Sequence, residues 1–106
     1  MTPLIVEVDG RQLELGGKEA AALIVMRFVG WSAVTLSDLE LATGNYVSAI
    51  SAVAKLKALG LVNEYSVRGF KLYTLTELGE KAADELRRRA EGLGLWRRVE
   101  EALGGA

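Results

Sequence analysis

The stretch from Ala20 to Val29 constrains the fold most strongly, because Arg27 is its only charged residue. It belongs to a longer segment, Lys18 to Val29, that consists of good helix formers and stops at Gly30. A helix that is apolar on nearly all sides must be covered on more than one side. We therefore expect a central helix, with the N-terminal part of the chain or a second subunit as an additional cover.

Two short segments before this helix predict a β-hairpin. Residues 4–8 and 11–15 have strand-like patterns, and the Asp-Gly pair between them is a strong signal for a tight turn. Leu13 and Leu15 lie on one face of the second strand. Because two strands alone are only marginally stable, we expect this hairpin either to cover the core or to form a loosely held arm.

Capping residues predict two helices after the central one. Thr35 fits the N-cap of a short helix that stops at Gly44, and Asn45 fits the N-cap of a longer helix that runs to about Leu59. The glycine-containing turn between them suits a helix-turn-helix. On the longer helix we expect a buried apolar face: Tyr46, Ala49, Ile50, Val53 and Leu56. We expect the opposite face to consist of Asn45, Ser48, Ser51, Ala52 and Lys55.

The rest of the chain predicts a second hairpin and further helices. Residues 61–66 and 70–75 read as strands joined by a turn. Thr76 fits the N-cap of a long helix, and glycines at 92 and 94 separate that helix from a short one over residues 95–103.

Composition excludes several kinds of site. The chain of 106 residues contains no His and no Cys, which excludes disulfides, thiolate metal sites and Ser-His-Asp or Cys-His catalysis within one chain. The sequence has no paired acidic motif and no glycine-rich phosphate loop. We therefore expect that the protein is not an enzyme and binds no cofactor. The longest apolar run, residues 20–26, is too short to cross a bilayer. The first residues lack a basic stretch followed by an apolar one, so we expect no signal peptide. We therefore expect a cytoplasmic protein without a membrane partner. The chain contains only two Asn and one Gln residue, and few such amide side chains are typical of thermophilic proteins, so we expect a thermophilic source.

Two stretches carry a family resemblance. Lys55-Leu56-Lys57-Ala58-Leu59-Gly60-Leu61-Val62 leads from a helix into a strand, and Tyr73-Thr74-Leu75-Thr76-Glu77-Leu78-Gly79 leads from a strand into a helix. In this order, and about one hairpin apart, they resemble winged helix-turn-helix transcriptional regulators, especially the MarR-like and PadR-like groups. The resemblance covers roughly Lys18 to Ala90.

The resemblance implies an α+β, mainly helical fold. Residues 17–91 would form the winged helix-turn-helix domain, with an added N-terminal β-hairpin over residues 1–16 and a C-terminal helical extension over residues 92–106. The three parts together would make a single domain.

The resemblance also implies binding to double-stranded DNA. The helix from Asn45 to Leu59 would enter the major groove, and the wing, residues 61–75, would contact the backbone or the minor groove. The candidate DNA-contacting residues are Thr35, Ser37, Asn45, Tyr46, Ser48, Ser51, Ala52, Lys55, Arg68 and Lys71. Several have structural alternatives, with Asn45 as an N-cap only, Tyr46 as packing and the two serines as a solvated face. Arg68 and Lys71 are explained least by folding, because an exposed turn needs no cation.

The charge distribution fits either a DNA-binding homodimer or a winged helix whose partner is a protein. The formal net charge is −1, and the wing carries two cations against one acid. Few phosphate contacts imply weak binding by one copy, which a second copy would double. The resemblance implies an interface between terminal helices, with candidate residues Val25, Val29, Leu86, Leu93 and Trp96. Trp96 can alternatively pack on its own core. The alternative function is a winged-helix protein-interaction module in a larger transcription or replication assembly.

Overall fold

The computed structural model describes residues 4–29 and 33–102, which form an α+β fold with five helices and two small antiparallel sheets. The elements, in chain order, are β1 (Leu4–Val8), β2 (Arg11–Leu15), α1 (Gly17–Phe28), α2 (Leu36–Thr43), α3 (Tyr46–Ala58), β3 (Val62–Val67), β4 (Phe70–Leu75), α4 (Glu77–Gly92) and α5 (Trp96–Ala102). Each predicted helix and strand is present, with bounds that differ by a residue or two. The predicted helix ends at Gly30 and Leu103 lie outside the described residues.

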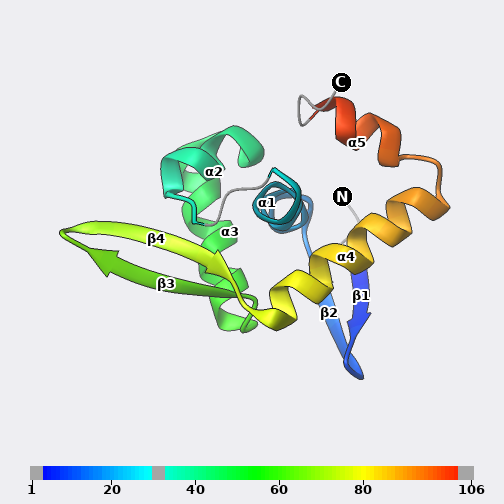
Figure 1. The fold of residues 1–106 in the computed structure, drawn as a ribbon, viewed down its shortest axis with the longest axis horizontal. Helices are drawn as coiled ribbons and strands as arrows, with labels where there is room; N and C mark the ends of the chain where they lie inside the picture. Colours follow the sequence, from blue (N-terminus) through cyan, green and yellow to red (C-terminus); the bar gives the residue numbers. More distant parts are fainter. Residues whose placement is uncertain (1–3, 30–32, 103–106) are drawn as a thin grey trace.

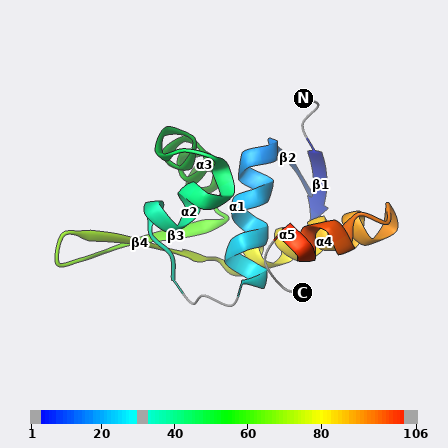
Figure 2. The same cartoon turned by 90° about the horizontal axis from the view of Figure 1, so that it is seen from above.

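Helix α1 runs through the middle of the fold, with α2 and α3 on one side and α4 on the other (Figures 1 and 2). Its Ala22 and Leu23 are fully buried. Its one cation between Ala20 and Phe28, Arg27, reaches out to Asp84 on α4, with Nε and Oδ1 3.2 Å apart. The prediction that this helix is covered on more than one side is confirmed, and the cover comes from the same chain.

The N-terminal hairpin belongs to the core. Strands β1 and β2 pair antiparallel, and the turn residues Asp9 and Gly10 have φ values of 51° and 78°, as a tight hairpin turn requires. Strand β1 lies against α4 (Figure 2), and Lys81 of α4 pairs with the turn carboxylate of Asp9 at 3.1 Å. The buried residues of the hairpin are Val6, Val8, Leu13 and Leu15. The hairpin is therefore one cover of the core, and the alternative of a loose arm is wrong.

The second hairpin, β3–β4, projects away from the rest of the molecule (Figures 1 and 2). Its tip is a turn at Arg68 and Gly69, with φ values of 50° and 82°. Its base is fixed by Val34, just before α2, whose backbone exchanges two hydrogen bonds with that of Tyr73 at 3.0 and 2.8 Å. The hairpin thus has an anchored base and an exposed tip.

The start of α4 is hydrogen-bonded to the junction between α3 and β3. The backbone N–H of Thr76 donates to the carbonyl of Leu61 at 3.0 Å, and the Thr76 hydroxyl donates to the carbonyl of Gly60 at 2.7 Å. The same hydroxyl accepts from the N–H of Gly79 at 3.0 Å, which caps α4. The two stretches that carry the family resemblance therefore meet in space.

Gly79 has no room for a side chain at this junction, so we expect its substitution to destabilise the fold. A Cβ on Gly79 would lie 2.0 Å from the carbonyl oxygen of Leu61, whereas a Cβ on Gly92, at the other end of α4, would meet nothing within 4 Å. We expect Gly79→Ala to lower the free energy of unfolding by about 1–3 kcal/mol or more, because backbone must move. Gly92→Ala should raise it by about 0.5–1 kcal/mol through helix propensity. Urea denaturation of both variants checks this, and equal effects would contradict the close contact.

Candidate functional site

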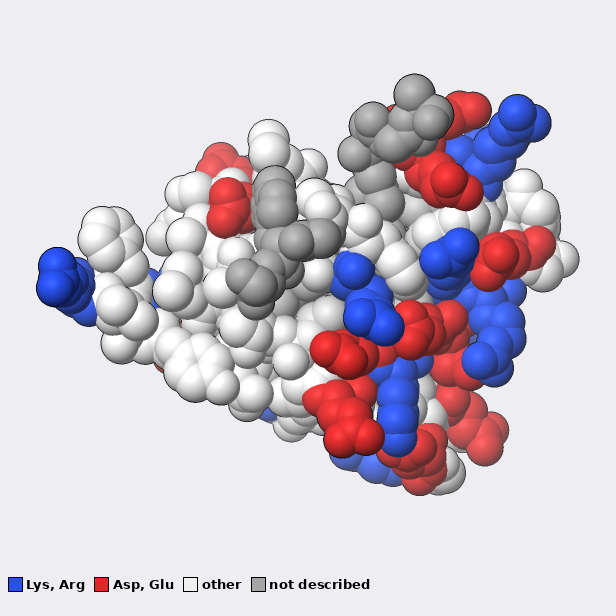
Figure 3. Space-filling view, in the orientation of Figure 1, with Lys and Arg blue, Asp and Glu red and all other residues white. Residues whose placement is uncertain are grey.

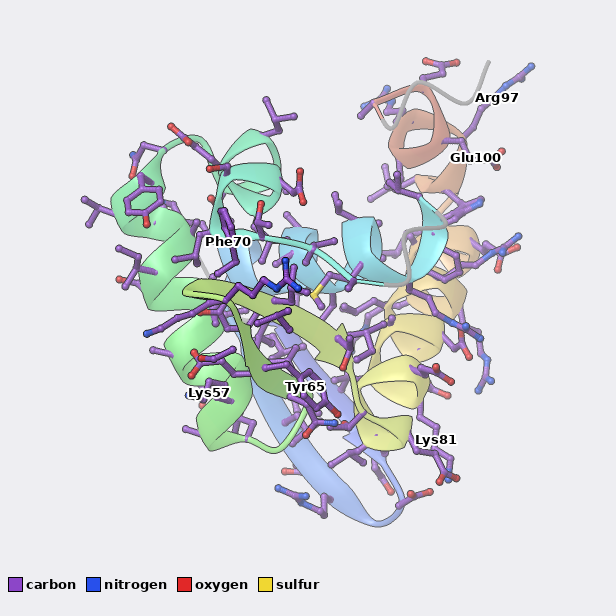
Figure 4. The ribbon with its side chains drawn as sticks, turned by 60° about the vertical axis from the view of Figure 1, so that its left-hand side comes forward. Lys57, Tyr65, Phe70, Lys81, Arg97 and Glu100 are labelled. Atoms are coloured by element: carbon purple, nitrogen blue, oxygen red, sulfur yellow. The ribbon has the colours of Figure 1, made fainter. Side chains whose placement is uncertain are left out.

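A groove of about 550 Å³ lies between α3, the start of α2 and the β3–β4 hairpin. We call it the hairpin groove. It is lined by Thr35, Leu36, Ser37, Tyr46, Ile50, Val53, Ala54, Lys57, Glu64, Gly69, Phe70, Lys71 and Tyr73. Lys57 of α3 and Phe70 of β4 lie on this side of the molecule, whereas Arg97 and Glu100 of α5 lie at the opposite end (Figure 4). The groove brings together three elements that are separate in the sequence.

The buried face of α3 matches the prediction only in part. Ala49, Val53 and Leu56 are buried as expected. Ser48 and Ala52 are only 8% and 1% exposed, so the expectation that they face outward to contact DNA is wrong. Their small side chains let α3 approach α1 and α2 closely. The burial of Ser48 leaves its hydroxyl satisfied, because the Lys18 ammonium of α1 donates to it.

The exposed face of α3 is largely apolar. Tyr46 and Ile50, which were expected on the buried face, are 47% and 45% exposed, and Val47 is 72% exposed. We call the exposed residues of the first helical turns the α3 outer face; they are Tyr46, Val47, Ile50, Ser51 and Ala54. Sequence reasoning missed Val47 and Ala54 here, and Lys57 and Phe70 beside them. Val47, Ile50 and Ala54 follow the same helical spacing as the predicted buried stripe, and this second stripe was the available signal.

Two candidate residues act as helix caps. The side-chain oxygen of Asn45 accepts from the N–H of Ser48 at 2.8 Å at the start of α3. The Thr35 hydroxyl accepts from the N–H of Asp38 at 3.2 Å, and the Asp38 carboxylate accepts from the N–H of Thr35 at 2.9 Å. The start of α2 therefore already holds a negative charge, which disfavours a phosphate there. Ser37 and Ser51 remain exposed.

The cations near α3 divide into paired and unpaired groups. The Lys55 ammonium lies 3.1 Å from Glu19 of α1. Burial opposes ionisation of Glu19, but the hydrogen bonds from Lys55 and from backbone N–H groups outweigh it and lower the pKa of Glu19. Lys57 pairs with Glu64 at 3.3 Å. Arg68 and Lys71, by contrast, form no ion pair with any described residue and are available to an outside anion.

Glu64 and Tyr73 form a polar link at the floor of the hairpin groove. The Tyr73 hydroxyl donates to Glu64 at 2.9 Å, and Tyr73 is only 3% exposed. This bond, helped by the ammonium groups of Lys57 and Lys71, lowers the pKa of Glu64 against the opposing effect of desolvation. Burial and then the bond to Glu64 raise the pKa of Tyr73 to about 12. The link ties both strands of the hairpin to Lys57 and hence to α3.

This link predicts that Tyr73 loses its proton at a higher pH than an ordinary tyrosine. The neutral hydroxyl stabilises the fold fully below the ordinary tyrosine pKa of 10.0, and this contribution is lost as pH rises through about 12. We expect the tyrosinate absorbance that is present in the wild type and missing in Tyr73→Phe to have its midpoint at about 12. Glu64→Gln should lower that midpoint, because it removes the facing negative charge. Circular dichroism in the same titration reports whether the chain is folded, and a midpoint at 10.0 in the folded chain would contradict the buried link.

Charge is distributed unevenly over the surface. In Figure 3 the half formed by α2, α3 and the hairpin is mostly uncharged, with Lys and Arg atoms at the hairpin tip, whereas charges of both signs crowd the α4 half. On α4, Arg87 pairs with Glu91 at 3.4 Å, and Arg88 pairs with Glu85. Of the three consecutive arginines at 87–89, two therefore have acidic partners on α4, and Arg89 donates to the backbone carbonyl of Ile5.

Two of the candidate dimer residues are buried within their own chain. Leu86 and Trp96 are 5% and 8% exposed, so little of either side chain is available to a second copy, and Trp96 packs on its own core as the alternative had it. The Trp96 ring packs edge-on against Phe28, with centroids 5.1 Å apart, and the Arg87 guanidinium lies 4.8 Å from the same ring. Trp96 thus fastens α5 to α1 and α4.

The other dimer candidates are more accessible. Val25 and Val29 are half-buried and line a second, apolar groove of about 620 Å³, which we call the α1 groove. Residues of α1, α2, α4 and α5 surround it, and Leu41 on its α2 side is 86% exposed. Leu93, at the end of α4, is 69% exposed.

A scan against protein-family models, a search of curated proteins and a search of solved structures each found no match to this chain. Within residues 4–29 and 33–102, no group of His, Cys, Asp and Glu is arranged to hold a metal ion. None of the described helices has the length and apolar character needed to cross a bilayer. No relative therefore supplies a function for the hairpin groove.

Proposed function

We propose that this chain is a winged helix-turn-helix transcriptional regulator that binds double-stranded DNA. Helix α3 would lie in the major groove, and the β3–β4 hairpin would act as the wing on the backbone or in the minor groove. The observation that carries the proposal is the exposed α3 outer face beside a projecting hairpin that presents two unpaired cations, Arg68 at its tip and Lys71 beside the tip on β4. The order of α2, a short connection, α3 and a hairpin supports it. The function requires neither a cofactor nor a catalytic group.

The contacts divide by chemistry. The α3 outer face would meet base edges, because the major groove admits one helix. Arg68 and Lys71 would contact phosphates, whereas Ser37 lies at the start of α2, where the Asp38 carboxylate disfavours a phosphate. Thr35 and Asn45 would serve mainly by capping, which holds α2 and α3 in place. Lys55 is tied to Glu19 and would contribute little.

Removing the cations of the hairpin tip tests this proposal. Each phosphate contact that is lost should reduce the slope of the logarithm of affinity against the logarithm of salt concentration by about 0.9. We expect Arg68→Ala and Lys71→Ala to weaken binding to genomic DNA fragments and to reduce this slope, and their combination to reduce it most. Fluorescence anisotropy over a salt series measures both quantities.

Arg97→Ala is the matched control, because Arg97 is an exposed arginine on α5, at the other end of the molecule (Figure 4). It should leave affinity and slope nearly unchanged. Equal losses for Arg97→Ala and Arg68→Ala, or no loss for either hairpin variant, would overturn the assignment of the hairpin as a DNA-binding wing.

We further propose that the regulator binds as a homodimer through the α1 groove. Two cations at each hairpin tip give few phosphate contacts, and a second copy would double them and read a second half-site. The α1 groove is apolar and open, with Val25 and Val29 in its wall and Leu41 exposed beside it. A second copy in this groove would bury these side chains.

A charge placed in the α1 groove should separate the two copies. In Val25→Lys the ammonium can reach solvent from a half-buried position, so the fold should persist while burial by a second copy becomes unfavourable. We expect the mass in solution to fall from that of two chains to that of one. Val47→Lys, the same change on the α3 outer face, should leave the dimer intact. A single-chain mass for the wild type would refute the homodimer.

A second candidate function is a winged-helix module that binds another protein. The observation that favours it is the apolar exposure around the hairpin groove, where Val47 is 72% and Phe70 is 70% exposed. Exposed apolar patches of this kind often mark protein interfaces. This candidate replaces the first if the protein fails to bind DNA at low salt and a co-purifying protein is released by Val47→Lys.

A further inference from the structure

The α3 outer face offers almost no polar group that could read a base by hydrogen bonding. Its members Val47, Ile50 and Ala54 present only carbon atoms to solvent, and they lie one above the other at helical spacing. Val47 and Ile50 are 72% and 45% exposed. Beside this stripe, only the hydroxyls of Tyr46 and Ser51 are polar.

The side chains that normally read bases by paired hydrogen bonds are absent from this face or engaged elsewhere. The oxygen of the Asn45 side chain accepts from Ser48 at the N-cap. Lys55 and Lys57, near the end of α3, pair with Glu19 and Glu64 at 3.1 and 3.3 Å. Arg and Gln do not occur in α3. A guanine therefore finds no arginine on this helix, and its two lysines are already ion-paired.

Only one apolar group protrudes from base pairs into the major groove, and that is the C5 methyl of thymine. An apolar side chain placed over a guanine or cytosine edge would remove water from polar atoms and return no hydrogen bond. Over a thymine methyl, the same side chain buries apolar surface on both partners. The chemistry of the α3 outer face thus matches thymine and opposes G·C pairs.

We propose that α3 selects A·T-rich DNA by packing Val47, Ile50 and Ala54 against thymine methyl groups. The inference rests on the proposed DNA-binding function and names the kind of sequence which that site takes. Affinity would come from phosphate contacts at the hairpin tip, and sequence preference would come from the methyl groups.

Deoxyuridine provides a direct test, because it differs from thymidine only by the missing C5 methyl. Binding of the full chain is measured to an A·T-rich duplex and to the same duplex with every thymine replaced by uracil. We expect uracil to weaken binding by about fourfold for each methyl contact that is lost. A duplex of the same length with only G·C pairs should bind more weakly than the thymine duplex.

Protein variants separate this inference from the proposed function. In Val47→Ala with Ile50→Ala the preference for thymine over uracil should shrink towards one, while the salt slope stays as in the wild type. Arg68→Ala should weaken binding to both duplexes by the same factor and preserve the preference. Equal binding of thymine and uracil duplexes by the wild type overturns the methyl inference alone, and absence of binding to either duplex at low salt overturns the proposed function with it.

Discussion

The close contact between Gly79 and the carbonyl of Leu61 holds in place the half of this molecule that contains the hairpin groove. Because Gly79 has no side chain, the first turn of α4 can lie directly on the backbone where α3 turns into β3. Thr76 closes the same junction with its hydrogen bonds to Gly60 and Gly79. The direction in which the β3–β4 hairpin leaves the core, and the path of α4 along α1 and β1, are set together at this point. A shift here would move the hairpin relative to α3.

The second determinant of the site is the small size of the residues that α3 buries. Ser48, Ala49 and Ala52 allow α3 to lie close to α1, and this turns the larger side chains of Tyr46 and Val47 outward. The solvent-facing side of α3 is therefore apolar because its buried side is occupied by small residues, which leaves the larger apolar side chains outside. The Lys18 ammonium satisfies the buried hydroxyl of Ser48, so this packing leaves no buried side-chain nitrogen or oxygen without a partner among the described residues.

Local signals predicted most of the fold. Thr35, Asn45 and Thr76 are N-caps in the structure, and Asp9-Gly10 and Arg68-Gly69 occupy hairpin turns. These features depend on chemistry within a few residues, which a sequence displays directly. The burial of α3 was predicted only in part, with Ala49, Val53 and Leu56 buried as expected. The helix carries apolar residues on two sides, and its contacts with α1 and α2 decide which of the others are buried. The burial of Trp96 likewise depends on distant partners, Phe28 and Arg87.

The candidate site joins the weakly charged hairpin to the apolar α3 outer face. The two surfaces would contribute differently to binding. Two unpaired cations at the hairpin tip can hold a phosphate backbone only loosely, since each contact contributes one released counterion. An exposed apolar helix face cannot hold polar base edges at all without loss of their hydration. A DNA-binding role is consistent with both properties only if copies act together and the sequence offers methyl groups. Under the proposed function, the apolar face that would suit a protein partner would instead select thymine on DNA.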